Sequence, residues 1–358
     1  MSTLILDMMD RRPIWAMPGW VPEEVRAAMP ADWELVVVTD ETDGSGDGAG
    51  RVSPLVLEHG PSATAYLGYG VPEALLRVAP NLRWIHSGAA GVGSSLTPTL
   101  RAHPAVFTNS AGIHAPPMAE SVLGMILYFG RGLGLAAESQ RKARWDTAPY
   151  YAAGAPLSEL STATVGIVGY GGIGREVARR VASLGADVLA LKRREPVPGD
   201  AALEPLSGGG TLADRITVLH GPEGLDRILR SSDILVLAAP ETDETRGMMD
   251  AEAFARMPQG ALFINVARGK LVDEQALVSA LESGKLRGAG LDVFATEPLP
   301  ADHALWSTPN TLITPHVSGV TRGFWRREND LILHNLAAMV AGAPLDQWKN
   351  VVDQGAGY

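Results

Sequence analysis

The sequence predicts an α/β protein of two domains, each built around a doubly wound parallel β-sheet. The chain has 358 residues, which is enough for two domains with separate hydrophobic cores. Short apolar runs of strand length alternate with helix-length segments along most of the chain, and this alternation is typical of parallel sheets. A glycine-rich turn at residues 169–174 separates an apolar run from a helical segment, as happens at the first crossover of such a sheet.

The first hundred residues predict a small domain with a flavodoxin-like fold. Expected strands cover residues 13–17, 34–39, 63–67 and 82–86. Expected helices cover residues 22–29 and 72–78, and Pro22 suits an early helical position. Residues 40–50 (DETDGSGDGAG) have the composition of a flexible loop.

A second, Rossmann-type domain follows a helix expected at residues 118–131. Thr164–Val168 is expected as a buried strand and Arg175–Leu184 as its crossover helix. Residues 195–215, which include three consecutive glycines, are interpreted as an insertion, and residues 329–340 as a final helix. The remaining strands of this parallel sheet are expected at residues 186–191, 234–238, 261–265, 288–292 and 311–313.

Composition and charge exclude several classes of function. The formal net charge is −10 and no basic stripe is present, which argues against a nucleic-acid partner. The absence of cysteine excludes disulfides, thiolate catalysis and cysteine-bound metals. The longest apolar stretch, residues 122–129, is too short to span a bilayer, and no secretory signal is visible. A cytoplasmic protein without a membrane partner is therefore expected.

The turn GYGGIG at residues 169–174 carries a dinucleotide-binding fingerprint, because it follows an apolar strand and opens a helix. The first glycine permits a tight turn, the second lets the backbone approach a pyrophosphate, and the third lets helix and strand pack closely. Free N–H groups at the start of the helix favour an anion. A glycine-rich turn without a ligand is the alternative. The predicted cofactor contacts of this turn are Gly169, Gly171, Gly172, Ile173 and Gly174.

Three polar residues at the ends of later strands form a candidate catalytic set. They are Arg268 in NVARG, Glu297 in LDVFATEP and His316 in TPH. A cation that can grip a carboxylate, a titratable imidazole and a carboxylate that orients the imidazole are the parts needed for hydride transfer to a 2-keto acid. Taken alone, the arginine has a plain alternative as a surface residue, and the histidine is one of eight in the chain.

Together with the glycine turn, these fragments resemble the D-isomer-specific 2-hydroxyacid dehydrogenase family, from about Asn109 to His316. The resemblance implies that Arg268 binds the substrate carboxylate and carbonyl oxygen, that His316 protonates the keto oxygen, and that Glu297 holds the other ring nitrogen. No metal ion is expected, because Arg268 and His316 supply the electrophilic groups. The resemblance also implies a substrate domain of residues 1–117 and 322–358 and a dinucleotide-binding domain of residues 118–321.

The loop SGAAGVG at residues 87–93 is a candidate anion site, because its small residues expose successive backbone N–H groups. In the resembled family this loop holds the substrate carboxylate, and a plain connecting turn is the alternative. Tyr66, Tyr69 and His86 are candidates for a substrate wall. The predicted substrate contacts are Ala89, Ala90, Gly91, Arg268 and His316. The further cofactor contacts that the resemblance implies are Ala239, Pro240, Thr245, Ala267, Asp292 and His316; for Asp292, a strand-end acid that caps the following turn is the alternative.

The end of the second Rossmann strand favours NADP(H) as the cofactor. Lys192 stands where an NAD enzyme usually carries an acid for the ribose hydroxyls, and Arg193 and Arg194 follow it. Three cations suit a 2′-phosphate, and arginine offers bidentate contact. A solvated basic turn is the alternative, and NAD(H) stays possible.

These observations predict an oxidoreductase that reduces small 2-keto acids, of the glyoxylate or hydroxypyruvate type, with NADPH. A family relative that acts on another 2-hydroxy acid with NAD is one alternative. A nucleotide-sensing interaction protein on the same fold is another, since such a protein can keep all three candidate residues. The helix up to Trp145 and the aromatic stretch at 149–151 resemble the dimer arm of the family, so a homodimer is expected.

Overall fold

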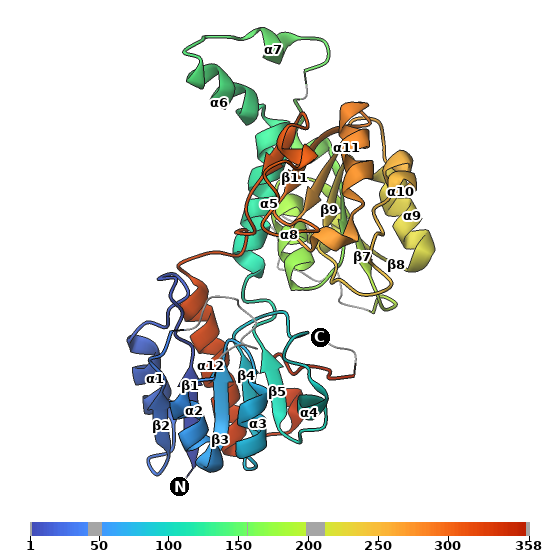
Figure 1. The fold of residues 1–358 in the computed structure, drawn as a ribbon. Helices are drawn as coiled ribbons and strands as arrows, with labels where there is room; N and C mark the ends of the chain where they lie inside the picture. The colour runs from blue at the N-terminus through green and yellow to red at the C-terminus, as the bar shows by residue number, and fades with distance from the viewer. Residues whose placement is uncertain (1, 42–51, 156, 198–211, 356–358) are drawn as a thin grey trace. The chain divides into compact units, whose positions relative to one another are not determined.

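The structure is a computed structural model that describes residues 2–41, 52–155, 157–197 and 212–355. The chain divides into two compact units, one formed by Met1–His114 and Val320–Tyr358 and the other by Ala115–Gly319. Each unit contains a parallel sheet with helices on both faces, which confirms the predicted fold class (Figure 1). Most of the predicted loop 40–50 and of the predicted insertion 195–215 lies outside the described residues.

The first unit has a five-stranded parallel sheet in the flavodoxin-like order β2-β1-β3-β4-β5. Its apolar side chains alternate between the two faces along each strand, as in β1, where Leu4 and Leu6 join one core and Ile5 the other. Helices α1 (Trp20–Ala28) and α12 (Phe324–Ala341) cover one face. Helices α2 (Pro54–His59), α3 (Glu73–Val78) and α4 (Pro98–Arg101) cover the other. The strands are β1 (Thr3–Asp7), β2 (Glu34–Val37), β3 (Ala63–Gly68), β4 (Trp84–Ser87) and β5 (Val106–Asn109).

The strand predicted at residues 13–17 is wrong, and the first strand is β1 at Thr3–Asp7. β1 lies between β2 and β3, and its apolar residues are fully buried, so it reads as a short apolar run without alternation. Residues 13–17 form a turn in which the Trp15 and Ala16 amides donate to the Arg12 carbonyl. Met17 joins the hydrophobic core and Trp15 packs against it, although neither residue belongs to a strand.

The second unit has a seven-stranded parallel sheet in the order β12-β11-β10-β9-β6-β7-β8, a Rossmann arrangement with one added strand. Helices α5 (Ala115–Gly130) and α8 (Gly172–Ser183) pack on one face. Helices α9 (Gly221–Ser231), α10 (Ala251–Arg256) and α11 (Glu274–Glu282) pack on the other. Two more helices, α6 (Leu133–Arg141) and α7 (Ala148–Tyr151), follow α5. The strands are β6 (Thr164–Val168), β7 (Asp187–Lys192), β8 (Ile216–His220), β9 (Ile234–Leu237), β10 (Ala261–Asn265), β11 (Leu286–Leu291) and β12 (Thr311–Ile313).

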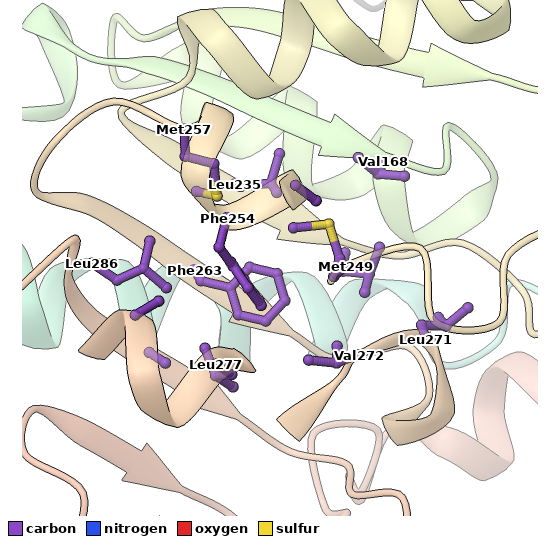
Figure 2. Close-up of a cluster of buried hydrophobic side chains, with 14 of the residues drawn as sticks. Val168, Leu235, Met249, Phe254, Met257, Phe263, Leu271, Val272, Leu277 and Leu286 are labelled. Atoms are coloured by element: carbon purple, nitrogen blue, oxygen red, sulfur yellow. The ribbon is translucent and has the colours of Figure 1, made fainter. Parts of the chain in front are cut away.

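Figure 2 shows the core between this sheet and helices α10 and α11. Phe263 of β10 lies at its centre and meets Phe254 of α10 edge to face, with ring centroids 5.3 Å apart. The neighbours of Phe263 in β10, Leu262 and Ile264, point to the opposite face and pack with α5 and α8. The strand is therefore buried on both sides, which fixes the position of the turn that follows it.

The chain reverses direction across the sheet between β6 and β9, because β7 and β8 extend to one side and β9 to β12 to the other. Ligands of open parallel sheets bind at the carboxyl ends of the strands beside such a switch point. Among the helices in the described residues, none combines the length and apolar character required to cross a membrane.

Candidate active site

The glycine turn joins β6 to α8 at the carboxyl edge of the seven-stranded sheet. Gly169 has φ +105°, and an added Cβ there would lie 2.5 Å from the backbone nitrogen of Ala239, so only glycine fits. An added Cβ at Gly174 would overlap the Gly169 carbonyl oxygen. At Gly171, by contrast, no described atom lies within 4 Å of the added Cβ, so this side of the turn is open to a ligand. No side chain caps α8, which leaves its first N–H groups available, and the turn fits a dinucleotide diphosphate.

The strand next to this turn ends in the predicted cations. β7 pairs with β6 and ends at Lys192, which is half-buried. Arg193 and Arg194 follow directly and are exposed. The three side chains therefore belong to the strand end where the adenosine ribose lies in dinucleotide-binding sheets.

The loop after β9 lies against the glycine turn, and hydrogen bonds of the Thr245 hydroxyl fix its conformation. The Ala238 amide donates to the Val168 carbonyl over 2.8 Å, which ties the loop to the end of β6. The Thr245 hydroxyl donates to the Pro240 carbonyl at 2.7 Å and accepts from the Thr242 amide at 2.8 Å. The hydroxyl of Thr245 thus closes the loop on itself.

The turn after β10 presents Arg268. Asn265 is buried, accepts from the Ala267 amide at 3.0 Å and donates to the Arg268 carbonyl at 3.1 Å. This side chain replaces the ladder bonds that end with the strand. Arg268 itself is exposed, and its guanidinium donates to the Ala267 carbonyl at 2.7 Å. The remaining donors of the guanidinium are available for a carboxylate.

The structure brings Glu297 and His316 together, although 19 positions separate them. The His316 Nδ1 and Glu297 Oε2 atoms are 2.7 Å apart, and the second Glu297 oxygen accepts from the Phe294 amide at 2.9 Å. The histidine side chain is half exposed, so its Nε2 edge can meet a ligand. A carboxylate on one ring nitrogen fixes the orientation of the ring and leaves the other nitrogen for proton transfer.

Asp292 holds the backbone on both sides of His316. The carboxylate is fully buried and accepts from the Thr314 hydroxyl at 2.6 Å, the Val317 amide at 2.9 Å and the Ser318 amide at 3.0 Å. The Asp292 carbonyl accepts from the His316 amide at 2.8 Å. His316 has φ +54°, a left-handed conformation that costs energy outside glycine, and these bonds stabilise it.

The Arg268 turn and the Glu297 loop lie in direct contact at Gly269. A Cβ added there would overlap the Phe294 carbonyl and the Ala295 nitrogen. The Ala295 amide also donates to Glu274 at 2.8 Å, and the other oxygen of Glu274 lies 3.3 Å from His303 Nε2. The carboxylates of Glu274 and Glu297 and the close backbone contact at Gly269 thus fix the loop that carries Glu297.

The loop at residues 87–93 belongs to the first unit and follows β4. The Ser110 amide donates to the Ala89 carbonyl at 3.3 Å, and the Asn109 side chain donates to the Ala90 carbonyl at 2.9 Å. Within the described residues, the Ala90 and Gly91 amides have no hydrogen-bond acceptor. Two neighbouring N–H groups without an acceptor are what an anion requires.

The predicted substrate wall is wrong for the first unit. Tyr66 and Tyr69 are buried with hydroxyls bonded to Asp7 and to the Trp15 carbonyl, respectively. His86 is fully buried and bonded through both ring nitrogens. These side chains are bonded within the first unit and present little or no surface to a ligand.

Comparison with known proteins identifies the family. The profile of the NAD-binding domain of D-isomer specific 2-hydroxyacid dehydrogenases matches residues 123–318, which is more than half of the chain. The chain belongs to the D-isomer specific 2-hydroxyacid dehydrogenase family.

Named relatives and solved structures agree with this assignment to the family. A glycerate dehydrogenase of Methylorubrum extorquens is 31% identical, over 78% of this chain and 81% of that protein. A glyoxylate reductase of Thermofilum pendens is 32% identical over 76% of each chain. The structure of a D-isomer specific 2-hydroxyacid dehydrogenase from Xanthobacter autotrophicus Py2, in complex with NADPH and MES, is 30% identical and superimposes with a TM-score of 0.73 over 100% of this chain and 99% of that chain.

Membership of the family confirms two predictions. The protein is an NAD(P)-dependent oxidoreductase, and its cofactor is NAD(P)(H). The residues of the second unit that were predicted for catalysis and cofactor binding all lie at the carboxyl edge of its sheet, in the loops that follow or in the first turn of α8. In the described part of the chain, no group of three or more His, Asp or Glu side chains is placed to hold a metal ion.

Sequence reasoning missed the residues that fix these loops. Glu274 follows Asp273, a few residues after Arg268, and its position as the first residue of α11 was the available signal. The clamp by Asp292 carries no signal of its own, because a strand-end acid has the same appearance whether it caps a turn or meets a cofactor. Because the carboxylate is fully buried, the structure shows it holding the turn at His316, and its contact with the cofactor stays a prediction.

Proposed function

We propose that the protein reduces small 2-keto acids, of the glyoxylate or hydroxypyruvate type, to 2-hydroxy acids with NADPH. The observation that carries this proposal is the 2.7 Å pair of Glu297 and His316 at the edge that also presents Arg268. An imidazole oriented by a carboxylate can protonate a keto oxygen, and a nearby guanidinium can hold the substrate carboxylate. Relatives named glyoxylate reductase and hydroxypyruvate reductase support this substrate class.

Each residue then has a defined task. Bound NADPH supplies the hydride that is added to the keto carbon. Arg268 holds the carboxylate and the carbonyl oxygen through its fork of N–H groups, and the Ala90 and Gly91 amides hold the carboxylate. His316 gives the proton on Nε2 to the keto oxygen while Nδ1 stays bonded to Glu297. In the reverse direction, His316 takes this proton back.

The cofactor would be held along three loops. The open side of the glycine turn and the uncapped start of α8 suit the diphosphate. The loop at Ala239, Pro240 and Thr245, together with Ala267 and Asp292, would meet the nicotinamide half. Lys192, Arg193 and Arg194 would meet the 2′-phosphate, because no acid stands at this strand end to receive ribose hydroxyls. A solved relative from Sinorhizobium meliloti, named an NADPH-dependent glyoxylate/hydroxypyruvate reductase, supports this preference.

The preference for NADPH is tested at the two exposed arginines. Replacing Arg193 and Arg194 by Ala should weaken NADPH binding by about 1.5–3 kcal/mol for each lost charged hydrogen bond and leave NADH binding nearly unchanged. Arg230→Ala is the matched control, because it removes an exposed arginine in the last turn of α9. Equal losses for both cofactors, or a wild-type preference for NADH, would overturn the assignment.

The activity is tested with a panel of 2-keto acids and both cofactors. Glyoxylate and hydroxypyruvate should be reduced with NADPH faster than pyruvate or phosphohydroxypyruvate. Turnover confined to a phosphorylated acid or to NADH would favour a different branch of the family. Tight NADPH binding without turnover of any 2-keto acid would favour the nucleotide-sensing alternative.

The remaining assignments follow from the resemblance and from exposure. We propose that the first unit binds substrate, that the second binds the cofactor, and that the protein is a cytoplasmic homodimer. Helices α6 and α7 project away from the seven-stranded sheet, as a dimer arm would (Figure 1). Trp145 in the loop between them is 97% exposed, and Tyr151 at the end of α7 is 84% exposed. Sedimentation of the wild type and of Trp145→Ser tests the dimer, which the substitution should weaken.

A further inference from the structure

A fully buried polar cluster lies beneath the 87–93 loop in the first unit. His86 of β4, Ser110 after β5 and Glu328 of α12 are each 0% exposed. The His86 Nε2 and Glu328 Oε1 atoms are 2.8 Å apart. The Ser110 hydroxyl lies 2.9 Å from the same Glu328 oxygen. Residues more than 200 positions apart in the chain therefore meet at one carboxylate oxygen.

The hydrogen bonds of the cluster run in one direction, toward Glu328. Trp84 Nε1 donates to the Thr108 hydroxyl at 2.9 Å, and this hydroxyl lies 2.8 Å from His86 Nδ1. The other acceptor near the Thr108 hydroxyl, the Ile85 carbonyl, is at 3.5 Å. We therefore assign the hydroxyl as the donor in its shorter contact with His86 Nδ1. His86 then carries its proton on Nε2 and donates to Glu328.

The cluster is connected to the 87–93 loop through Ser110. Its hydroxyl lies 3.0 Å from the Ser87 carbonyl and 2.9 Å from Glu328, so it can donate to either. Its amide donates to the Ala89 carbonyl. Together with the bond from Asn109 to the Ala90 carbonyl, three carbonyls of the loop are turned toward the protein. This arrangement is what leaves the Ala90 and Gly91 amides for a ligand.

Packing alone does not account for a carboxyl group at this position. Glu328 Oε2 is buried and has no hydrogen-bond donor among the described residues. A buried polar atom without a partner lowers stability, and an apolar side chain of similar size would avoid this cost. A buried carboxyl group with one oxygen bonded to His86 and Ser110 and the other without a donor among the described residues points to a task at a functional site.

We propose that Glu328 is a positioning residue for the 87–93 loop and acts through Ser110 and His86. It fixes the loop so that the Ala90 and Gly91 amides converge on the substrate carboxylate, and α12 thereby determines how well a 2-keto acid is bound. This inference rests on the proposed function, because it takes the loop as the site of the substrate carboxylate.

Ser110→Ala tests the connection with the smallest change. Its matched control is Ser232→Ala, which also removes a fully buried hydroxyl, one that donates to the Ile228 carbonyl in the second unit. The KM for the best 2-keto acid should rise about 3–10-fold in Ser110→Ala, as expected from the loss of one hydrogen bond, with kcat and the NADPH dissociation constant nearly unchanged. Amide hydrogen exchange of residues 88–93 should become faster in Ser110→Ala and stay at the wild-type rate in the control.

A double-mutant cycle tests whether Glu328 acts through Ser110. Glu328→Gln should raise KM in the same way, and the double variant should lose no more than the larger single variant, because both changes remove one pathway. Additive losses, or a KM in Ser110→Ala equal to that of the wild type, would overturn the inference.

The exchange measurement separates this inference from the proposed function. If the wild type reduces no 2-keto acid, the proposed function fails, while exchange in residues 88–93 of Ser110→Ala still reports whether the loop is held by the cluster. If Glu328→Gln does not fold, Ser110→Ala and its control decide alone. Exchange at the wild-type rate in Ser110→Ala would show that the cluster does not hold the loop.

Discussion

Gly269→Ala should separate the two catalytic loops. The added Cβ would lie less than 3.0 Å from the backbone of Phe294 and Ala295, a distance that real Cβ atoms essentially never reach. Ordinary carbon contacts begin at about 3.5 Å, so the Arg268 turn and the Glu297 loop must move apart by more than about 0.5 Å. Neither partner is the end of a flexible side chain, so the backbone itself must shift.

The expected consequence is a large loss of turnover with a smaller loss of stability. The Phe294 amide that moves is a donor to Glu297, which in turn orients His316. A misplacement of about 1 Å at reacting groups costs about 10²-fold in rate, so kcat/KM should fall by about 10–10²-fold. Overpacking should lower the free energy of unfolding by about 1–3 kcal/mol. NADPH affinity should change little, because the glycine turn belongs to a different loop.

The assay compares Gly269→Ala with Gly124→Ala, which adds the same methyl group to α5, where no described atom lies within 4 Å. The control should keep wild-type kcat/KM and gain roughly 0.5–1 kcal/mol of stability, since alanine suits a helix better than glycine. Steady-state kinetics and urea unfolding give both quantities. A Gly269→Ala enzyme with wild-type kcat/KM would refute the inference that contact at Gly269 sets the relative position of Arg268 and Glu297.

Three further outcomes are expected. Arg268→Lys keeps the charge but loses the planar fork, so kcat/KM for the keto acid should fall severely while NADPH binding persists, and near-normal turnover in Arg268→Ala would make it a surface arginine. His316→Ala should cost about 10²–10⁴-fold in kcat/KM, and Glu297→Gln should lower kcat at unchanged cofactor affinity; full activity in His316→Ala would exclude it as the acid. Burial raises the pKa of Asp7 above its ordinary value of 3.8, although the hydrogen bond from Tyr66 acts in the opposite direction. The stability that this shift contributes is therefore fully present below pH 3.8 and is lost as the pH rises through the folded-state pKa. Urea unfolding of Asp7→Asn should therefore show a gain over the wild type that grows with pH across this window and is then constant, whereas a gain independent of pH would contradict the role of the charge.

Most strands of both sheets could be predicted because each is a local apolar run, whereas β1, β5 and β8 were not predicted. Apolar runs in β6, β9 and β10 are long enough to be read directly, and the glycine turn places the first crossover. β1 was missed because the bulky apolar residues around Trp15 gave a stronger signal nearby. β8 was missed because only Ile216 among its residues is fully buried, as expected for an edge strand.

The candidate catalytic residues could be found from their motifs, but the groups that hold them could not. The hydrogen bonds that Asp292 accepts from Thr314 and Glu274 accepts from Ala295 join segments about twenty positions apart, and the spacing of the residues does not reveal them. The same is true of Glu328, which meets His86 across 242 positions. Patterns in sequence report periodicity within an element, whereas these contacts depend on which loops the sheet places side by side.

The loops after β11 and β12 replace the ladder hydrogen bonds of the strands in the same way. Each leaves a strand, loses the ladder hydrogen bonds and is too short to form a core of its own. In these described loops, carboxylates accept the hydrogen bonds instead. Glu274 accepts from the Ala295 amide, and Glu297 accepts from the Phe294 amide. Asp292 accepts from the amides of Val317 and Ser318. A carboxylate accepts several N–H groups at once, which an amide or hydroxyl side chain does less well. Replacing such an acid by its amide should therefore disturb the position of a neighbouring catalytic group more than the global stability, and the loss should appear in kcat before it appears in unfolding.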